Sequence, residues 1–462
     1  MSLFSFYQFG VIFMKSIDQK ILRIAVPSIV SNITIPLLGL VDTAISGHMG
    51  SAVYIGAVAV GSMIFNVIYW VFGFLRMGTS GMTSQALGNR DLRGVVMLLM
   101  RSLSVALTVA LAIIILQSPL GHAAMYLVNP TADIRAAAWT YFRICVWGAP
   151  AMLCLYSLTG WYIGMQNTRL PMFISIMQNV VNIVASLTFV YGMGMKVEGV
   201  ALGTLTAQYA GIIVSAILWL RSYGRRLLRY VDWHSILERT AMGRFFTVNR
   251  DIFLRTLFIV SVNFYFLSAG ASQGAIILAV NTLLMQLFTL FSYVMDGFAY
   301  AGEALCGRLH GAGNRVEFNH TVSHLFGWGL ALSLAYTIVY AVGGTQFLSL
   351  LTDNQQVVSA SDTYLWWAVL IPICGMAAFI WDGVYIGITA TRGMLLSSVA
   401  SAAIFFGLYM SLRAPLANHA LWLAFIVYLA ARGVIQTLLF KYSLLISAQR
   451  SPSTPADTMP PA

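Results

Sequence analysis

Residues 160–169 read GWYIGMQNTR and residues 383–392 read GVYIGITATR, so six of ten positions are identical at an offset of 223 residues. A second pair of segments, GTSGMTSQALG at 78–88 and GFAYAGEALCG at 297–307, keeps its flanking glycines at an offset of 219 residues. A nearly constant offset of this kind indicates an internal duplication. The sequence therefore predicts a chain built from two homologous halves.

The composition is that of an integral membrane protein. Of the 462 residues, 59% are hydrophobic and only 9% are charged, and the mean hydropathy is +0.80. These values lie far from those of soluble globular domains. Apolar runs long enough to cross about 30 Å of hydrocarbon as helices recur along the chain, and they are continuously apolar, unlike transmembrane strands. We expect twelve transmembrane helices, at 21–46, 53–77, 95–117, 139–163, 170–191, 198–220, 249–269, 275–300, 318–342, 363–388, 394–412 and 419–446.

The duplication predicts how these helices are arranged. Because each half holds six helices, both halves begin on the same side of the membrane, and a pseudo-axis along the membrane normal should relate them. We predict an all-α integral membrane protein with two pseudo-symmetric six-helix bundles around a central cleft. The expected parts are an N-terminal cytoplasmic segment at 1–20, an N-lobe at 21–220, a basic linker at 221–248, a C-lobe at 249–446 and a disordered tail at 447–462, which is rich in proline and serine.

The net charge of +11 marks topology and does not indicate a nucleic-acid site. With the N-terminus inside, loops on that side carry twelve arginines between Arg90 and Arg392, whereas the opposite loops carry only Arg135, Lys196 and Arg413. This bias follows the positive-inside rule. We therefore expect a multi-pass protein of the inner membrane with both termini cytoplasmic, in contact with the bilayer and not with nucleic acid, and we expect a monomer.

Asp42 lies in the middle of the apolar stretch IPLLGLVDTAISGHMG at residues 35–50. A charged carboxylate near the bilayer centre costs at least about 3 kcal/mol, so such residues are usually protonated, paired or turned toward a polar cavity. At an offset of about 222 residues Asp42 aligns near Phe264, so the second half has no counterpart to it. Because removal from water favours the neutral form of a carboxyl, Asp42 is a candidate proton switch in the first half.

Possible partners of this carboxyl lie on two later helices. Asn179, Asn182 and Ser186 are spaced i, i+3 and i+7, which places them close to one helix face. The next helix adds Thr204 and Gln208, one turn apart. Amides and hydroxyls can satisfy a buried carboxyl in either protonation state. The alternative is that this stripe only holds helices together by interhelical hydrogen bonds.

The first helix also contains Pro27 and Pro36. Each proline lacks the N–H that would bond the carbonyl four residues earlier, so both are candidate bends. A helix that straightens or kinks when its own carboxyl changes charge could couple a proton to cargo. Alternatively, neither proline is a hinge, since prolines are frequent in transmembrane helices.

Three further acids, Asp296, Glu303 and Asp382, lie within or beside predicted helices of the second half. They are either a second polar site or members of structural ion pairs. Candidate basic partners are Arg76, Arg255, Arg308 and His310.

The sequence shows no catalytic or metal-binding pattern. Cys145, Cys154, Cys306 and Cys374 have no CxxC spacing, and the seven histidines form no HExxH motif. The GxGD signature of intramembrane aspartyl proteases is also absent. We expect no enzyme, no metal site and no cofactor, with H⁺ or Na⁺ only as a coupling ion.

Several motifs together resemble one transporter family. They are ILRIAVPSIVSN and LVDTAISGHMG in the first helix, then GTSGMTSQALGNRD, GWYIGMQNTRLPM, MDGFAYAGEALCGRLHGAG and WDGVYIGITATRG. Over residues 15–446 the chain resembles the multidrug and toxic compound extrusion (MATE) transporters, in particular the DinF-type branch. The resemblance implies an antiporter that exports organic cations or amphipathic compounds in exchange for protons or sodium. It also implies that Asp42 is the coupling acid, Pro27 the bend, and Asn182 with Thr204 the polar surroundings of the acid.

One departure from this family bears on the coupling ion. Relatives often carry an acid four residues after the asparagine of the fifth helix, whereas here Ser186 follows Asn182 at that spacing. Loss of a second charge weakens a sodium site more than a proton site, so we expect proton coupling. The alternatives are a sodium-coupled exporter and a lipid-linked saccharide flippase. The flippase would need a strongly basic cavity, but most arginines lie in loops.

Overall fold

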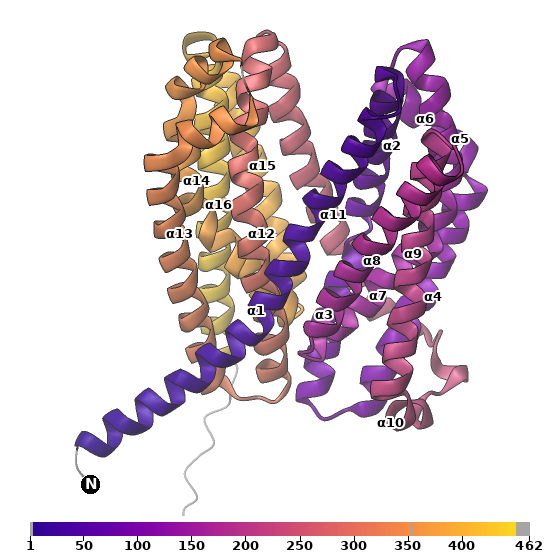
Figure 1. The fold of residues 1–462 in the computed structure, drawn as a ribbon. Helices are drawn as coiled ribbons and strands as arrows, with labels where there is room; N and C mark the ends of the chain where they lie inside the picture. The colour runs from indigo at the N-terminus through magenta and orange to yellow at the C-terminus, as the bar shows by residue number, and fades with distance from the viewer. Residues whose placement is uncertain (1–2, 353, 450–462) are drawn as a thin grey trace, which may run out of the picture.

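The computed structural model describes residues 3–352 and 354–449, and all regular elements in these ranges are helical (Figure 1). Twelve spans in the described ranges are long and apolar enough to cross a membrane, so the predicted number is confirmed. Some spans consist of two consecutive helices, such as α2 and α3, which meet at Phe72 and Gly73. The helices of the first half are α1 (Leu3–Gly47), α2 (Ala52–Val71), α3 (Phe74–Gly88), α4 (Leu92–Ile115), α5 (Gln117–Val128), α6 (Ala132–Cys145), α7 (Ala149–Gly164), α8 (Arg169–Leu187), α9 (Val197–Trp219) and α10 (Arg225–Leu227). Those of the second half are α11 (Arg239–Ala271), α12 (Ala275–Gly311), α13 (Arg315–Leu351), α14 (Gln355–Gly387), α15 (Thr391–Leu416) and α16 (Asn418–Gln449).

The helices form two bundles, which confirms the predicted architecture. Helices α2 to α10 make the N-lobe on the right of Figure 1, and α11 to α16 make the C-lobe on the left. The ribbons of the two lobes diverge toward the top of the view and approach each other toward the bottom, where α3 packs against α11, α12 and α14. Contacts between the lobes are therefore concentrated at one end of the molecule, the end at which α3 finishes.

The duplication is visible in where the helices begin. Ala52 and Ala275 start α2 and α12, and these residues are 223 positions apart. The same offset relates the starts of α4 and α13, at Leu92 and Arg315, and of α6 and α14, at Ala132 and Gln355. The two halves therefore follow the same succession of helices.

The turns repeat as well. Arg90 and Gly313 both have positive φ, at 59° and 68°, just after α3 and α12. Gln166 and Thr389, at 61° and 53°, stand in the same relation after α7 and α14. These turns end the helices that carry the duplicated motifs. The register of 223 residues places the GTSGMTSQALG and GFAYAGEALCG match four residues out of step, which is about one helical turn, so small residues of the same helix face had been aligned.

Several helices extend beyond the predicted boundaries. Helix α5 occupies part of the predicted polar gap at 118–138, and α11 begins at Arg239, inside the predicted linker at 221–248. Helix α16 continues to Gln449, three residues into the predicted tail, and the rest of that tail lies outside the described residues. A helix satisfies its own backbone hydrogen bonds, so it can continue past the hydrocarbon into polar sequence that hydropathy alone would end.

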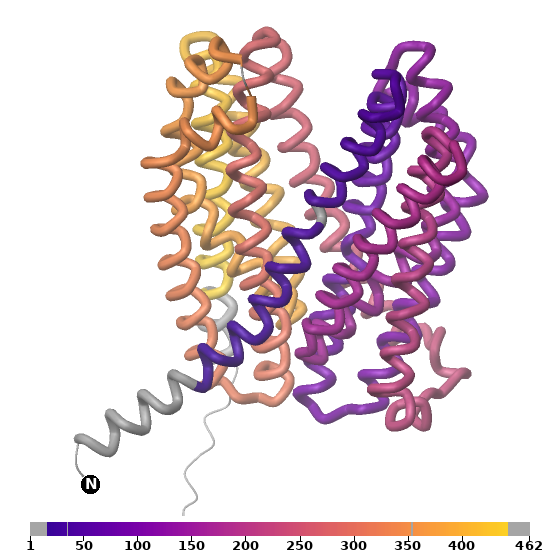
Figure 2. The backbone as a smooth tube through the Cα atoms, in the orientation of Figure 1, coloured from indigo at the N-terminus to yellow at the C-terminus, as the bar shows by residue number. Residues whose placement is uncertain are grey.

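Helix α1 crosses from one lobe to the other, as the tube in Figure 2 shows. Asn32 donates from Nδ2 to the carbonyl oxygen of Tyr293 on α12 at 3.0 Å. Only two residues later, the hydroxyl of Thr34 lies 2.9 Å from that of Ser175 on α8. The first part of α1 is thus attached to the C-lobe and the last part to the N-lobe, and the change occurs between Asn32 and Thr34.

Candidate functional site

Asp42 is buried in the last part of α1, with 7% of its surface exposed. Its Oδ1 is inaccessible and has no hydrogen-bond partner among the described residues. One turn later, the hydroxyl of Ser46 donates to the backbone carbonyl of Asp42 at 2.8 Å and so does not serve the carboxyl group. An unpartnered buried carboxylate oxygen is costly, and such a group is expected to carry a proton, bind water or bind a cation.

Helices α8 and α9 contribute the polar groups that the sequence predicted. Asn182 and Ser186 are fully buried on α8, and Asn182 donates from Nδ2 to Oγ1 of Thr204 on α9 at 3.1 Å. Oδ1 of Asn182, Oγ of Ser186 and Oε1 of Gln208 are buried without hydrogen-bond partners among the described residues. We call Asp42, Asn182, Ser186, Thr204 and Gln208 the N-lobe polar cluster.

Tyr141 of α6 connects Asp42 to the rest of this cluster. It lies within electrostatic range of Asp42 and within hydrogen-bonding reach of Thr204, and its hydroxyl is 3.3 Å from that of Ser62. Tyr141 was not predicted from the sequence, because nothing distinguishes it from the other aromatic residues of its helix. Asn179 has a different role from the one proposed for the cluster: it donates to the backbone carbonyl of Thr34 at 2.9 Å and ties α8 to α1.

The corresponding region of the C-lobe is aromatic. At the offset of 223 residues, Asp42, Asn182 and Ser186 correspond to Tyr265, Phe405 and Tyr409. The ring centroids of Tyr265 lie 6.3 Å from Phe405 and 5.8 Å from Tyr409. The duplicated position thus has an ordinary packed solution, and the N-lobe alone fills it with polar groups. This contrast favours a function for the N-lobe polar cluster over a purely structural role.

The predicted acids of the C-lobe have basic partners. Asp382 of α14 accepts hydrogen bonds from Arg255 of α11, from Nη2 of Arg432 at 2.6 Å and from Nε2 of Gln436 at 2.7 Å. All four side chains are buried. Of the candidate partners, Arg255 is confirmed, while Arg432 and Gln436 of α16 could not be identified from sequence spacing. Asp382 is therefore a fully satisfied ion-pair residue.

Glu303 and Asp296 of α12 differ from Asp382. Oε2 of Glu303 accepts from Nη1 of Arg76 at 3.3 Å, across the interface between the lobes. Asp296 makes no hydrogen bond or ion pair with any described residue, although it lies within electrostatic range of Arg76 and Arg255. Arg308, another candidate partner, instead donates to Oε1 of Gln166 at 2.8 Å.

Neither proline interrupts α1, which is helical from Leu3 to Gly47. Pro27 leaves the carbonyl of Arg23 without its helical donor, and Oγ1 of Thr168 approaches this carbonyl at 3.5 Å and that of Ile24 at 3.1 Å. The Ser28 hydroxyl also donates to the Ile24 carbonyl at 2.8 Å, a contact that tends to bend helices. The position of Pro27 is thus suited to bending, and Pro36 lies close to where α1 changes lobe.

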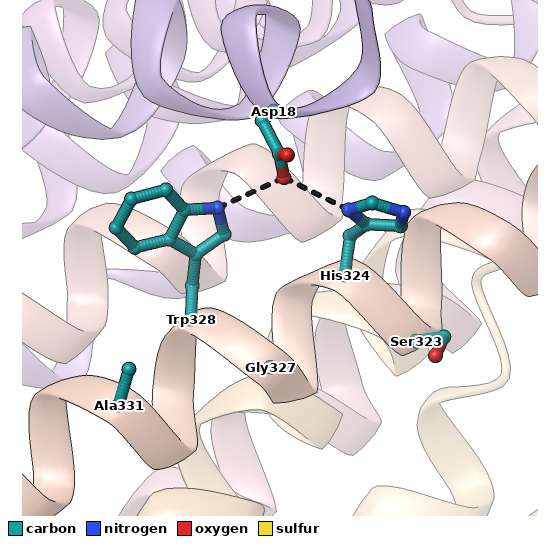
Figure 3. Close-up of a pocket in the computed structure, with 6 residues that line it drawn as sticks. All are labelled: Asp18, Ser323, His324, Gly327, Trp328 and Ala331. Carbon is teal, nitrogen blue, oxygen red and sulfur yellow. Dashed lines mark hydrogen bonds and ion pairs between the residues drawn. The ribbon is translucent and has the colours of Figure 1, made fainter. Parts of the chain in front are cut away.

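A surface pocket of about 400 Å³ lies where the first part of α1 meets α13 (Figure 3). Oδ1 of Asp18 accepts from Nε1 of Trp328 at 3.0 Å and lies 2.8 Å from Nδ1 of His324. Lys20 and Glu317 form an ion pair of 3.0 Å between the same helices. These contacts attach the first part of α1 to the C-lobe.

Comparison with known proteins gives consistent matches. The MatE family profile matches residues 27–188 and 252–409, once in each half of the chain. The chain is 36% identical to DNA damage-inducible protein F of Escherichia coli K12, over 91% of this chain and 92% of that protein. It is 22% identical to the probable multidrug resistance protein NorM of Thermotoga maritima, over 75% of this chain and 74% of that protein. A solved structure described as the outward-facing conformation of a multidrug resistance MATE family transporter matches with a TM-score of 0.83 at 18% identity, covering 94% of this chain and 97% of that one.

Proposed function

The chain belongs to the MatE family, and from this premise we propose that it is a multidrug efflux antiporter that exports organic cations or amphipathic compounds in exchange for protons. Asp42 is the coupling carboxylate in this proposal. The membrane is the inner membrane, with both termini and the arginine-rich loops on the cytoplasmic side. Relatives named as multidrug resistance proteins support the substrate class.

The observation that carries the proposal is the set of buried oxygens without donors around Asp42. Oδ1 of Asp42, Oδ1 of Asn182 and Oγ of Ser186 are all inaccessible and all without partners among the described residues. A proton on Asp42 would supply one donor and remove the charge, while a cation would be attracted to the same carboxylate. A single carboxylate is fully neutralised by either one, so binding of a proton disfavours binding of a cationic compound. This competition is the requirement for exchange.

Alternating access would follow from relative motion of the two lobes. The lobes contact each other at one end and diverge at the other (Figure 1), and α1 is bound to both. A change of charge at Asp42 alters how the last part of α1 packs against α8, while its first part stays attached to α12 and α13. Protonation could thereby change the balance between the two arrangements of the lobes.

Proton coupling is tested in proteoliposomes that contain the purified chain, ethidium and an imposed pH gradient. We expect Asp42→Asn to abolish proton-driven ethidium export while the amount and thermal stability of the protein stay close to wild type. Asp133→Asn is the matched control, because it makes the same chemical change at an exposed position on α6. Export that persists in Asp42→Asn would refute the proposed role of the carboxyl. Export by the wild type that requires sodium, and not a pH gradient, would instead show sodium coupling.

A further inference from the structure

The contact between Arg76 and Tyr300 resembles a ligand in a binding site. The guanidinium carbon of Arg76 lies 4.2 Å from the centroid of the Tyr300 ring, and its Nη1 donates to Glu303 at 3.3 Å. Arg76 comes from α3 of the N-lobe, whereas Tyr300 and Glu303 lie one turn apart on α12 of the C-lobe. An aromatic face beside a carboxylate is the arrangement that recognises organic cations. One lobe thus presents a cation site, and the other lobe fills it.

We propose that Tyr300 and Glu303 form a binding site for monovalent organic cations, which Arg76 occupies while the lobes are together at this end and leaves when they separate. The proposal rests on the proposed function, because it assumes that the lobes separate here during transport. Arg76 then acts as an internal substitute for cargo.

The charge balance around the site explains why a cation should replace Arg76. Three arginines and three acids lie within electrostatic range of one another at the centre of the molecule: Arg76, Arg255, Arg432, Asp296, Glu303 and Asp382. Only Arg76 belongs to the N-lobe. Its departure would leave the C-lobe group with one excess negative charge, and Glu303, which is 1% exposed, would lose its ion-pair partner. Isolated buried charges are strongly unfavourable, so a single positive charge is expected to take the vacant place.

The surrounding interface is too tightly packed to admit a ligand in the present arrangement. A Cβ atom added to Gly81 of α3 would lie 2.0 Å from the carbonyl oxygen of Ile386, and one added to Gly307 would lie 1.9 Å from Oγ of Ser84. The Ser84 hydroxyl also donates to the backbone carbonyl of Glu303 at 3.1 Å. The cation site can therefore be reached only after α3 and α12 move apart.

Ethidium binding to the purified full-length chain in detergent, followed by fluorescence anisotropy, tests the site. We expect Arg76→Ala to bind ethidium about tenfold more tightly than wild type, and Glu303→Gln in that variant to remove the gain. Arg308→Ala is the matched control, because Arg308 also bonds across the lobes, to Gln166, without filling an aromatic and acidic site. Unchanged affinity in Arg76→Ala, or an equal gain in Arg308→Ala, would overturn the proposal.

A second measurement applies even if Arg76→Ala is poorly folded. Removal of Arg76 leaves an unpaired carboxylate, and added methylguanidinium should restore part of the lost thermal stability. We expect a higher unfolding temperature of Arg76→Ala in millimolar methylguanidinium chloride than in sodium chloride of equal ionic strength, and no such difference for wild type or Arg76→Lys. Equal unfolding temperatures in the two salts for Arg76→Ala would overturn the proposal.

These readouts separate this inference from the proposed function. Binding and thermal stability in detergent do not require a proton gradient or Asp42. A wild type that exports no cations, together with the expected gain in Arg76→Ala, would refute the antiporter and leave the site supported. Proton-driven export by the wild type, with no gain in Arg76→Ala, would refute the site alone.

Discussion

Replacement of Asp382 by asparagine should be far more destabilising than the same replacement of Asp42. Asp382 is the shared acceptor of Arg255, Arg432 and Gln436, and all of these side chains are buried. Removal of one partner from a buried ion pair typically costs about 3–5 kcal/mol, because the other charge stays buried without compensation. Asp296 lies nearby and can offset part of this loss, so we expect a decrease of about 3 kcal/mol in the free energy of unfolding of Asp382→Asn.

Asp42→Asn should cost less than about 1 kcal/mol, because the carboxyl group makes no hydrogen bond that the variant would lose. The free energies of unfolding are measured by titration of the purified protein with dodecyl sulfate in mixed micelles, followed by tryptophan fluorescence. A double-mutant cycle with Arg255→Met provides the control, and the two substitutions should be less costly together than their sum. The reasoning would be refuted if Asp382→Asn were as stable as wild type, or if Asp42→Asn were destabilised equally.

Three other predictions concern the α1 bend, a polar contact of the C-lobe and the linker. Pro27→Ala restores a backbone N–H to α1, so the chain should become more stable by up to about 3 kcal/mol and export ethidium more slowly, as thermal unfolding and proteoliposome efflux would show; faster export would contradict the bend. Asn281→Ala removes the partner of Asn418 and Trp422, with bonds of 2.8, 3.0 and 2.9 Å, and should cost about 2–3 kcal/mol in thermal unfolding, a loss that Asn281→Gln at unchanged stability would make doubtful. The Ser235 hydroxyl and the nearby Arg93 guanidinium hold the pKa of Asp232 below its ordinary value, so Asp232 stabilises the linker above about pH 4 and this stabilisation is lost as the pH falls through the lower folded-state pKa. Hydrogen–deuterium exchange of residues 228–238 should therefore differ between wild type and Asp232→Asn at pH 6 and converge at pH 3, and a difference that persists at the lower pH would contradict this assignment.

The fold was predictable from the sequence because it depends on patterns that lie within single segments. Apolar length determines the number of spans, and the motif that ends α7 recurs at the end of α14 because Gln166 and Thr389 both occupy a turn with positive φ. Boundaries were less accurate. Helix α11 begins ten residues before the predicted start at 249, because Arg239, Arg244 and their neighbours remain helical outside the hydrocarbon.

The candidate site was predictable only in part. Asp42, Asn182, Ser186 and Thr204 could be selected because polar residues at membrane depth are rare and their spacing places them on helix faces. Tyr141 could not be selected, since only the packing of α6 against α9 brings it to Thr204. The pairing of Arg76 with Glu303 depends on how the two lobes meet, and no local pattern contains that information.

The attachment of α1 to both lobes limits how far the lobes can rotate as rigid bodies. Asp18 and Asn32 anchor one part of α1 to the C-lobe, and Thr34 anchors the other part to the N-lobe. A rotation must either break one of these sets of contacts or deform the few residues between them, where Pro36 already weakens the backbone ladder. Elastic energy stored in this short stretch would oppose the motion in one direction and assist its reversal, so removal of the anchor at Asp18 should widen the range of lobe arrangements that the protein samples.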